Sequence, residues 1–179
     1  MKEFKYWIAK IFYKINKNNP EVISDYFRKA GMNIWGGCNI CCNIMCSEPY
    51  LISIGNNVTI SGNVTFVTHD NSVCKISKEF ANLFGFIKIG DNCFIGQNAI
   101  LMYGVTLSDN IIVASGSVVC NSFIESNIIV GGNPARKIGT WVGLEEKARA
   151  MAMKKKEAVL AVQNKSYEKF VVRSDSNGK

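Results

Sequence analysis

The stretch IGDNCF-IGQNAI-LMYGVT-LSDNII-VASGSV, residues 89–118, repeats one pattern every six residues. Each unit begins with an aliphatic residue, and the same pattern runs through residues 54–65, after which Phe66 begins a further unit. Asparagine and glycine accept a left-handed backbone at low cost, so they are typical of tight corners. One of the two stands three residues after the start of each of the seven complete units, at Asn57, Asn63, Asn92, Asn98, Gly104, Asn110 and Gly116.

A second position of the unit, four residues after its start, is always apolar or small. It holds Val58, Val64, Cys93, Ala99, Val105, Ile111 and Ser117. Each unit therefore predicts a short strand with two inward-facing positions, followed by a corner. Such a unit cannot bury its apolar face alone, so the repeats are expected to stack as a parallel β-solenoid.

Over residues 31–140 this pattern resembles the hexapeptide-repeat acyltransferases. The resemblance implies an all-β solenoid, a left-handed parallel β-helix with three six-residue faces per coil and with N-terminal and C-terminal helical caps. The implied organisation is an N-terminal helical cap (1–31), a left-handed β-helix (32–139) with a loop insertion at 70–88, and a C-terminal helix with a disordered tail (140–179).

The bulk composition indicates one domain, because the chain has 179 residues. The formal net charge is +7, but no nucleic-acid recognition motif accompanies it, so nucleic acid is not expected as a partner. Attraction to a phosphorylated cofactor or to an anionic membrane surface remains open. Lysines interrupt the apolar N-terminal segment, which excludes a signal peptide or a membrane span there and favours the cytoplasm.

Two helices are expected before the repeats. Residues 3–16 carry an apolar face at helical spacing, and Pro20 and Gly31 are placed to begin and end a second helix. The first helix is interpreted as a cap over the open end of the solenoid, and the alternative is a peripheral helix on a membrane surface. Its apolar face consists of Phe4, Trp7, Ile8, Ile11 and Ile15.

Elsewhere the repeat is interrupted or ends. The spacing from Cys46 to Ile54 is eight residues instead of six, which predicts a two-residue bulge in SEPYLI. The pattern stops again after Phe66, and residues 70–86 predict a long loop, a usual place for function. Residues 144–163 predict one C-terminal helix, and the polar tail from Ser174 is expected to be disordered.

Seven cysteines do not form the spacing of a secreted disulfide framework. The group Cys38, Cys41, Cys42 and Cys46 raises the alternative of a zinc or iron–sulfur site. Extending the six-residue pattern backwards places Cys38 and Cys46 at inward positions, as it does Cys93, where cysteine acts as a small apolar residue. We therefore expect no metal.

His69 is the one histidine of the chain. It stands three residues after Phe66, at the corner position of the repeat and at the root of the insertion. The alternatives are an inconsequential surface residue and a catalytic one, and the position favours catalysis. In hexapeptide-repeat acetyltransferases a histidine before the loop is the general base, and VTHDN resembles the form in enzymes of surface polysaccharides. In the galactoside and maltose type the histidine lies two positions later, where this chain has Asn71.

The resemblance implies direct acetyl transfer from acetyl-CoA to a hydroxyl, with His69 as base. Cys46 and Phe66 are equivalent one coil apart, so Glu48 should stack near Thr68 and orient the ring, unless it is a solvent-exposed bulge residue. For the acceptor, Asn43 matches a family asparagine and Asp70 could bind a hydroxyl. Phe84 could stack on a sugar ring, or it could only pin the loop down.

For acetyl-CoA, the family uses a groove between subunits of a homotrimer, which implies intersubunit active sites. A backbone amide near Gln97 would hold the oxyanion, and Arg136 would meet a CoA phosphate, with Lys137 as a substitute for missing basic positions. The matching contact positions are Gln97, Ser115, Cys120, Asn121 and Arg136.

These features predict an acetyl-CoA-dependent O-acetyltransferase acting on a saccharide in capsule or lipopolysaccharide biosynthesis. The alternatives are an N-acetyltransferase of a nucleotide-linked amino sugar, a drug acetyltransferase of the chloramphenicol or streptogramin type, and a non-catalytic scaffold. The γ-type carbonic anhydrases share the fold but need three histidines on zinc, and a single histidine excludes them.

Overall fold

The computed structural model describes residues 2–167, without the side chains of residues 2–4. The chain divides into two compact units, Met1–Gly139 and Thr140–Lys179, and each is described by itself. The tail from Ser174, expected to be disordered, lies outside the described residues.

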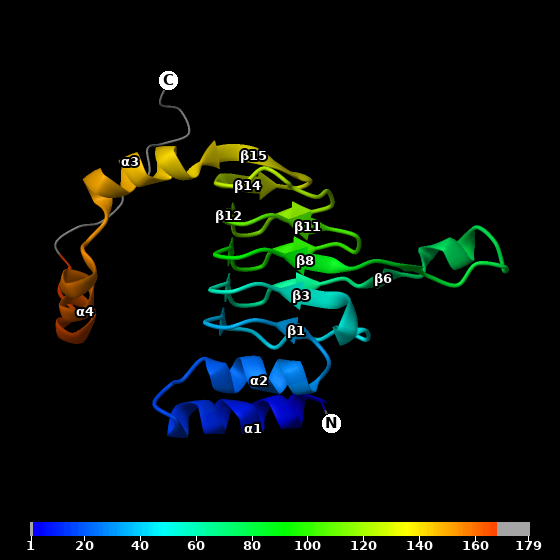
Figure 1. Cartoon of the computed structure of the whole chain (residues 1–179), viewed down its shortest axis with the longest axis horizontal. Coiled ribbons are helices and arrows are strands. Elements are labelled where there is room, and N and C mark those ends of the chain that lie inside the picture. Colours follow the sequence, from blue (N-terminus) through cyan, green and yellow to red (C-terminus); the bar gives the residue numbers. More distant parts are fainter. Residues whose placement is uncertain (1, 168–179) are drawn as a thin grey trace. The chain divides into compact units, whose positions relative to one another are not determined.

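The first unit is built on three sheets, named A, B and C, that the chain visits in rotation (Figure 1). We call one passage through the three sheets a tier. Sheet A contains β1 (Asn33–Ile34), β3 (Ile52–Ile54), β8 (Ile87–Ile89) and β11 (Thr106–Leu107). Sheet B contains β2 (Asn39–Ile40), β4 (Thr59–Ile60), β9 (Phe94–Ile95), β12 (Ile111–Val113), β14 (Ile128–Gly132) and β15 (Ala135–Thr140). Sheet C contains β5 (Thr65–Phe66), β10 (Ile100–Leu101) and β13 (Val118–Val119).

The pairing between tiers is parallel and follows the register that the repeat predicts. Ile54 pairs with Ile89, Ile60 with Ile95, and Phe66 with Leu101. The residues that begin the repeat units are all buried, so like positions stack on like positions through the core. The predicted parallel pairing of strands between tiers is therefore confirmed.

The corners of the repeat are also confirmed. All seven predicted corner residues have positive φ, from 54° at Asn57 to 81° at Gly104. Neighbouring corners between sheets A and B are linked by their side chains, since Asn57 donates to Asn92 and Asn92 donates to Asn110, each at 2.8 Å. The seven positions that follow the corners are buried, as predicted.

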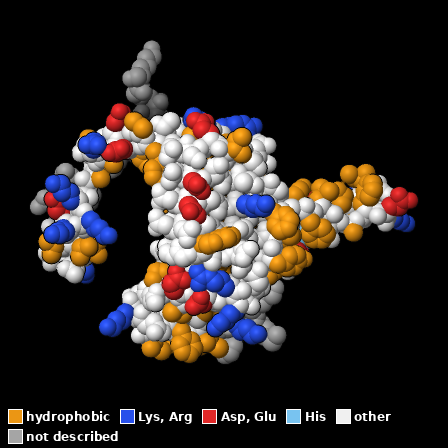
Figure 2. Space-filling model, in the orientation of Figure 1, with side chains coloured by type: hydrophobic (Ala, Val, Ile, Leu, Met, Phe, Trp, Pro, Cys, Tyr) orange, Lys and Arg blue, Asp and Glu red, His pale blue; other side chains and the backbone are white. Residues whose placement is uncertain are grey.

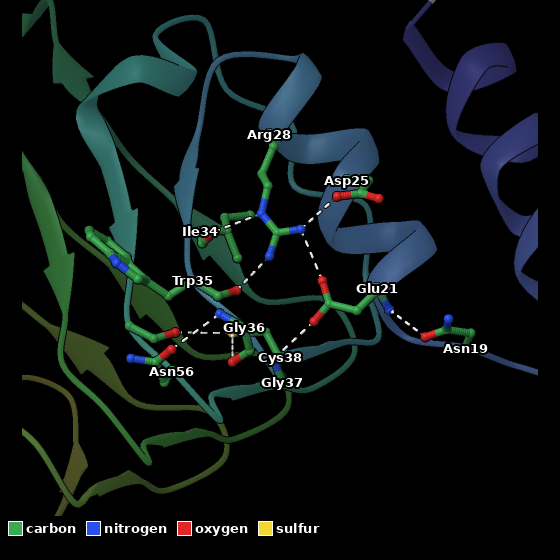
Figure 3. A network of polar contacts seen from close by, with 11 residues as sticks. Asn19, Glu21, Asp25, Arg28, Ile34, Trp35, Gly36, Gly37, Cys38 and Asn56 are labelled. Atoms are coloured by element: carbon green, nitrogen blue, oxygen red, sulfur yellow. Dashed lines mark hydrogen bonds and ion pairs between the residues drawn. The ribbon is translucent and has the colours of Figure 1, made fainter.

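Two helices, α1 (Lys2–Ile15) and α2 (Glu21–Lys29), lie over the first tier (Figure 1). Arg28 ties α2 to the sheet, because its Nε donates to Ile34 O at 2.7 Å and its Nη2 donates to Trp35 O at 2.6 Å (Figure 3). Glu21 accepts from the Gly37 amide at 2.9 Å and also pairs with Arg28. The helix thereby satisfies backbone groups of a tier that has no tier beneath it.

The predicted packing face of α1 is wrong. Tyr6, Ala9 and Tyr13 face the rest of the unit, with the Tyr6 ring 5.7 Å from Tyr26 and 5.9 Å from Phe27 between centroids. Ile11 and Ile15, expected to pack inward, are 37% and 69% exposed. The wide phenol rings fill the space above α2, so the aliphatic residues turn outward.

The interruptions of the repeat contain structure of their own. A short 3₁₀ helix, η1 (Pro49–Leu51), occupies the expected bulge. The insertion forms an arm with the antiparallel strands β6 (His69–Asp70) and β7 (Leu83–Phe84) and the 3₁₀ helix η2 (Ser72–Lys75) between them. The tier resumes at Ile87, so the last two residues of the expected 70–88 insertion belong to β8.

The second unit contains two helices, α3 (Trp141–Met151) and α4 (Lys155–Asn164). The single helix predicted over residues 144–163 is therefore wrong. Ala152 and Lys154 are extended, and Glu157 accepts the Lys154 amide at 3.0 Å, which begins a new helix. Among the described residues, no helix has the length and apolar character needed to cross a membrane.

Candidate active site

The candidate site is centred on a contact between the beginning of the arm and the segment before η1. The Nδ1 atom of His69 lies 2.8 Å from Oε2 of Glu48. The buried Thr68 hydroxyl donates to the same Oε2 at 2.6 Å. The expected stacking of Glu48 beside Thr68 and His69 is thus observed, although these residues are about twenty positions apart in sequence.

The electrostatics of this contact determine the form of the histidine ring. The Thr68 hydroxyl, and then the His69 ring, hold the pKa of Glu48 below its usual range by hydrogen bonding. Glu48 is therefore ionised and can only accept, so His69 Nδ1 must donate to it. The neutral ring then carries its lone pair at Nε2, and 35% of the His69 side chain is exposed.

The backbone around His69 differs from the expected corner. His69 lies in strand β6 and pairs with Phe84 across the arm, and their ring centroids are 5.8 Å apart at 50°. The chain does not turn at His69, because the insertion carries it away from the tier. Phe84 is 57% exposed beside the ring, so the two form one continuous surface.

The returning end of the arm passes very close to the third tier. The Gly85 amide donates to Thr68 O at 3.2 Å. A Cβ atom at Gly85 would lie 2.3 Å from the Gly104 amide nitrogen, which no side chain can tolerate. Glycine at this position therefore lets the arm lie against the tier and fixes the position of β6.

Asp70, expected to bind an acceptor hydroxyl, has partners within the chain. Its Oδ1 accepts the Ser72 amide at 2.8 Å, and its Oδ2 accepts the Tyr103 hydroxyl at 3.4 Å. The Ser72 bond is the main reason that the pKa of Asp70 is lowered. Asp70 thus helps to hold the arm beside the third tier.

Tyr103 is a residue of this site that the sequence analysis missed. Phe66 and Leu101 are register partners in sheet C, so Tyr103, two residues after Leu101, is equivalent to Thr68, two residues after Phe66. The six-residue repeat therefore contained the signal. The hydrogen bond from the Tyr103 hydroxyl to Asp70 could not be predicted in the same way, because this hydroxyl belongs to no motif.

Asn43 lines a cavity between the N-terminal helices and the segment before η1, and His69 is not among the lining residues of that cavity. The cavity has a volume of about 510 Å³. Ser47 and Pro49, which flank Glu48, also line it. Its other walls include Lys5, Ile8, Phe27, Lys29, Met32 and Met45.

The residues expected to contact acetyl-CoA fall into two columns. Gln97 and Ser115 precede the strands of sheet C, whereas Cys120 and Asn121 directly follow one of these strands, on the side where His69 leaves β5. Corners Asn98 and Gly104 lie six residues apart across sheet C, which corresponds to roughly 15–20 Å. Within one chain, the structure therefore does not bring Gln97 together with His69.

The basic residues after the last tier have different surroundings. The exposed Arg136 uses one guanidinium nitrogen to donate to Ala135 O at 2.8 Å. Lys137, expected as a substitute phosphate contact, is paired with Glu125. Of the two, Arg136 keeps more uncommitted donors for an anion.

Three of the seven cysteines, Cys38, Cys42 and Cys93, are buried as small core residues. Burial raises the pKa of Cys93 to about 11. Cys46 was expected inside but is only half-buried, while Cys42 is buried instead. Over residues 2–167, no three His, Cys, Asp or Glu side chains are grouped so that they could hold a metal ion.

Comparisons with known proteins agree with this architecture. A family model described as the hexapeptide repeat of succinyl-transferase matches residues 86–120. Protein CapG of Staphylococcus aureus is 41% identical over 145 residues, which cover 78% of this chain and 83% of that protein. Galactoside O-acetyltransferase of Escherichia coli is 31% identical over 152 residues, which cover 72% and 74%.

Among solved structures, a maltose O-acetyltransferase from Clostridium difficile 630 superposes with a TM-score of 0.54 at 25% identity. The match covers 78% of this chain and 85% of that one. Each of these three matches covers more than two thirds of this chain. The chain belongs to the hexapeptide-repeat acetyltransferases, a family of acyltransferase enzymes.

Proposed function

We propose that the protein transfers the acetyl group of acetyl-CoA to a hydroxyl of a saccharide, in the biosynthesis of capsule or lipopolysaccharide. The observation that carries the proposal is the hydrogen bond between His69 Nδ1 and the ionised Glu48, which leaves Nε2 ready to accept a proton. The names of two similar proteins, a galactoside and a maltose O-acetyltransferase, support a sugar hydroxyl as acceptor.

In the proposed mechanism, His69 Nε2 removes the hydroxyl proton as the sugar oxygen attacks the thioester carbonyl carbon. The tetrahedral intermediate then collapses, its carbon–sulfur bond breaks, and the imidazolium protonates the departing thiolate. Glu48 holds the ring in one tautomer and stabilises its positive charge, supported by Thr68. General-base assistance of this kind contributes on the order of 10²–10⁴ in rate.

Further residues are assigned to binding. We assign Asn43, Asp70 and Phe84 to the acceptor, with Phe84 stacking on a sugar ring beside His69. Acetyl-CoA is assigned to Gln97, Ser115, Cys120, Asn121 and Arg136, and the Gln97 amide is the proposed oxyanion donor.

These assignments require more than one copy of the chain. An oxyanion donor must lie within hydrogen-bond distance of the carbonyl that His69 serves. Because sheet C separates Gln97 from His69 within one chain, the donor must come from a neighbouring subunit. This requirement supports a homotrimer of left-handed β-helices with intersubunit sites, which we place in the cytoplasm, where acetyl-CoA is available.

A thiol-release assay with acetyl-CoA over a panel of sugars and amino sugars tests the proposal. We expect release with a saccharide that has free hydroxyls, and its loss in His69→Ala. Turnover of amino sugars alone, retained at high pH in His69→Ala because a free amine is already nucleophilic, would instead establish N-acetylation. Turnover of chloramphenicol or a streptogramin alone would establish a drug acetyltransferase. If the protein does not bind coenzyme A, the remaining alternative is a non-catalytic scaffold.

A further inference from the structure

The outward face of α1 combines exposed apolar side chains with lysines. Trp7, Phe12 and Ile15 are 59%, 55% and 69% exposed, and Ile11 lies among them. The opposite face, formed by Tyr6, Ala9 and Tyr13, packs on the unit. Figure 2 shows hydrophobic side chains gathered at the α1 end of the molecule, with Lys and Arg side chains nearby. The inward face already anchors the helix, so the outward face is not needed for folding.

The lysines lie at both borders of this apolar face. Lys5 is seven residues from Phe12, and Lys14 is seven residues from Trp7, so each lies beside the outermost ring on its side of the helix. Lys10 lies next to Lys14 on the helix surface, with Nζ 5.0 Å from the Tyr13 ring centroid. Long lysine stems at such borders let apolar side chains enter a bilayer while the charges stay at the headgroups.

The acidic groups of the neighbouring helix α2 are engaged elsewhere and do not neutralise these lysines. On α2, Glu21 and Asp25 both pair with Arg28, at 2.9 and 2.6 Å. The helix α1 itself carries four lysines and one acidic residue, Glu3. The face is therefore apolar and positively charged, which complements an anionic lipid surface. Two copies packed face to face would instead bring their lysines together.

From this charge complementarity we propose that α1 docks the protein on an anionic membrane surface, lying parallel to the bilayer with its outward face inserted at the headgroup level. The proposal does not depend on acetyl transfer. The cavity beside Asn43 is lined by Lys5 and Ile8 of the same helix, so docking would place this cavity close to the membrane. An acceptor carried by a lipid could then reach it.

The experiment is co-sedimentation of the full chain with vesicles of phosphatidylcholine alone or mixed with phosphatidylglycerol. We expect binding to the mixed vesicles, weak binding to the neutral ones, and loss of binding as salt is raised. The double variant Lys5→Gln, Lys14→Gln should bind about 25-fold more weakly, at about fivefold per lysine. The double variant Ile11→Ser, Ile15→Ser should lose at least about tenfold.

The matched control is Lys147→Gln, Lys155→Gln on α3 and α4, which should bind like the unaltered protein. Thermal melting and circular dichroism of every variant check that α1 remains folded. Binding that the control weakens as much as the Lys5, Lys14 variant would overturn the assignment to α1. Equal binding to neutral vesicles, or self-association through α1 without vesicle binding, would also overturn it.

Discussion

Asn63 and His69 occupy the same step of the six-residue repeat, three residues after Ile60 and Phe66, yet their backbones differ. Asn63 has a φ of 57° and turns the chain into the next sheet, whereas His69 continues as strand β6 into the arm. The side chain of His69 consequently meets Glu48 and Phe84. The same position of the repeat thus forms a corner where the next unit follows at once, and holds the proposed catalytic base where an insertion begins.

The largest effect on activity is expected when the imidazole of His69 is removed. His69→Ala should lower kcat by about 10²–10⁴ without lowering the melting temperature, because the side chain is part of neither a corner nor the core. Steady-state thiol release and thermal melting measure the two effects. Added imidazole should restore part of the activity, and a variant that stays inactive because it has unfolded would contradict the division of roles.

The next largest effect on activity is expected when the Glu48 carboxylate is replaced. Glu48→Gln should lower kcat by roughly 10²-fold or more, approaching the loss in His69→Ala, as when the carboxylate of a catalytic triad is replaced by its amide. The new amide can donate to Nδ1, which moves the ring proton to Nε2 and removes the base. Glu48→Asp should retain more activity, and Glu146→Gln on α3 is the matched control. Equal activities for Glu48→Gln and the control would remove Glu48 from the mechanism.

A smaller effect is expected in the titration of Glu48. The Thr68 hydroxyl is the main cause of the lowered pKa of Glu48, so Thr68→Val should raise that pKa toward its usual value. Glu48 must be ionised to orient His69, and this form is lost as pH falls through its pKa. The Glu48 carboxyl signal in ¹³C NMR should therefore titrate at higher pH in Thr68→Val and stay unchanged in Thr106→Val. A shift to lower pH would contradict the assigned hydrogen bond.

The smallest effect is expected at the corner. Asn63→Ala should destabilise the fold by about 1 kcal/mol, the cost of a left-handed backbone with an ordinary side chain. Asn63→Gly should be close to neutral, since glycine adopts this backbone freely. Urea unfolding measures both changes, and kcat should stay within about twofold of the original, well below the effect of losing a general base. A large loss of activity in Asn63→Gly would show that corners and chemistry are not separable.

The repeat could be predicted from sequence because its constraints are local. Each corner needs asparagine or glycine at one step, and each inward position needs an apolar or small residue, so residues 54–66 and 89–118 specified their own register. The same register brought Glu48 beside Thr68, which is how a contact between distant residues could be expected.

Sequence reasoning failed where tertiary contacts decide. The apolar stripe of α1 was expected to pack inward, but the rings of Tyr6 and Tyr13 fill the space above α2. The contact of Asp70 with Tyr103 depends on the path of the arm, which no periodicity fixes. The break between α3 and α4 carries neither glycine nor proline, so no local signal marked it.

The tautomer of His69 can be measured directly, because the chain has a single histidine. In ¹⁵N-imidazole NMR of the protein without a histidine tag, both ring nitrogens can be assigned to His69 without ambiguity. We expect the neutral ring to carry its proton on Nδ1, and Glu48→Gln to reduce this preference. A ring protonated mainly on Nε2 in the unaltered protein would contradict the proposed base.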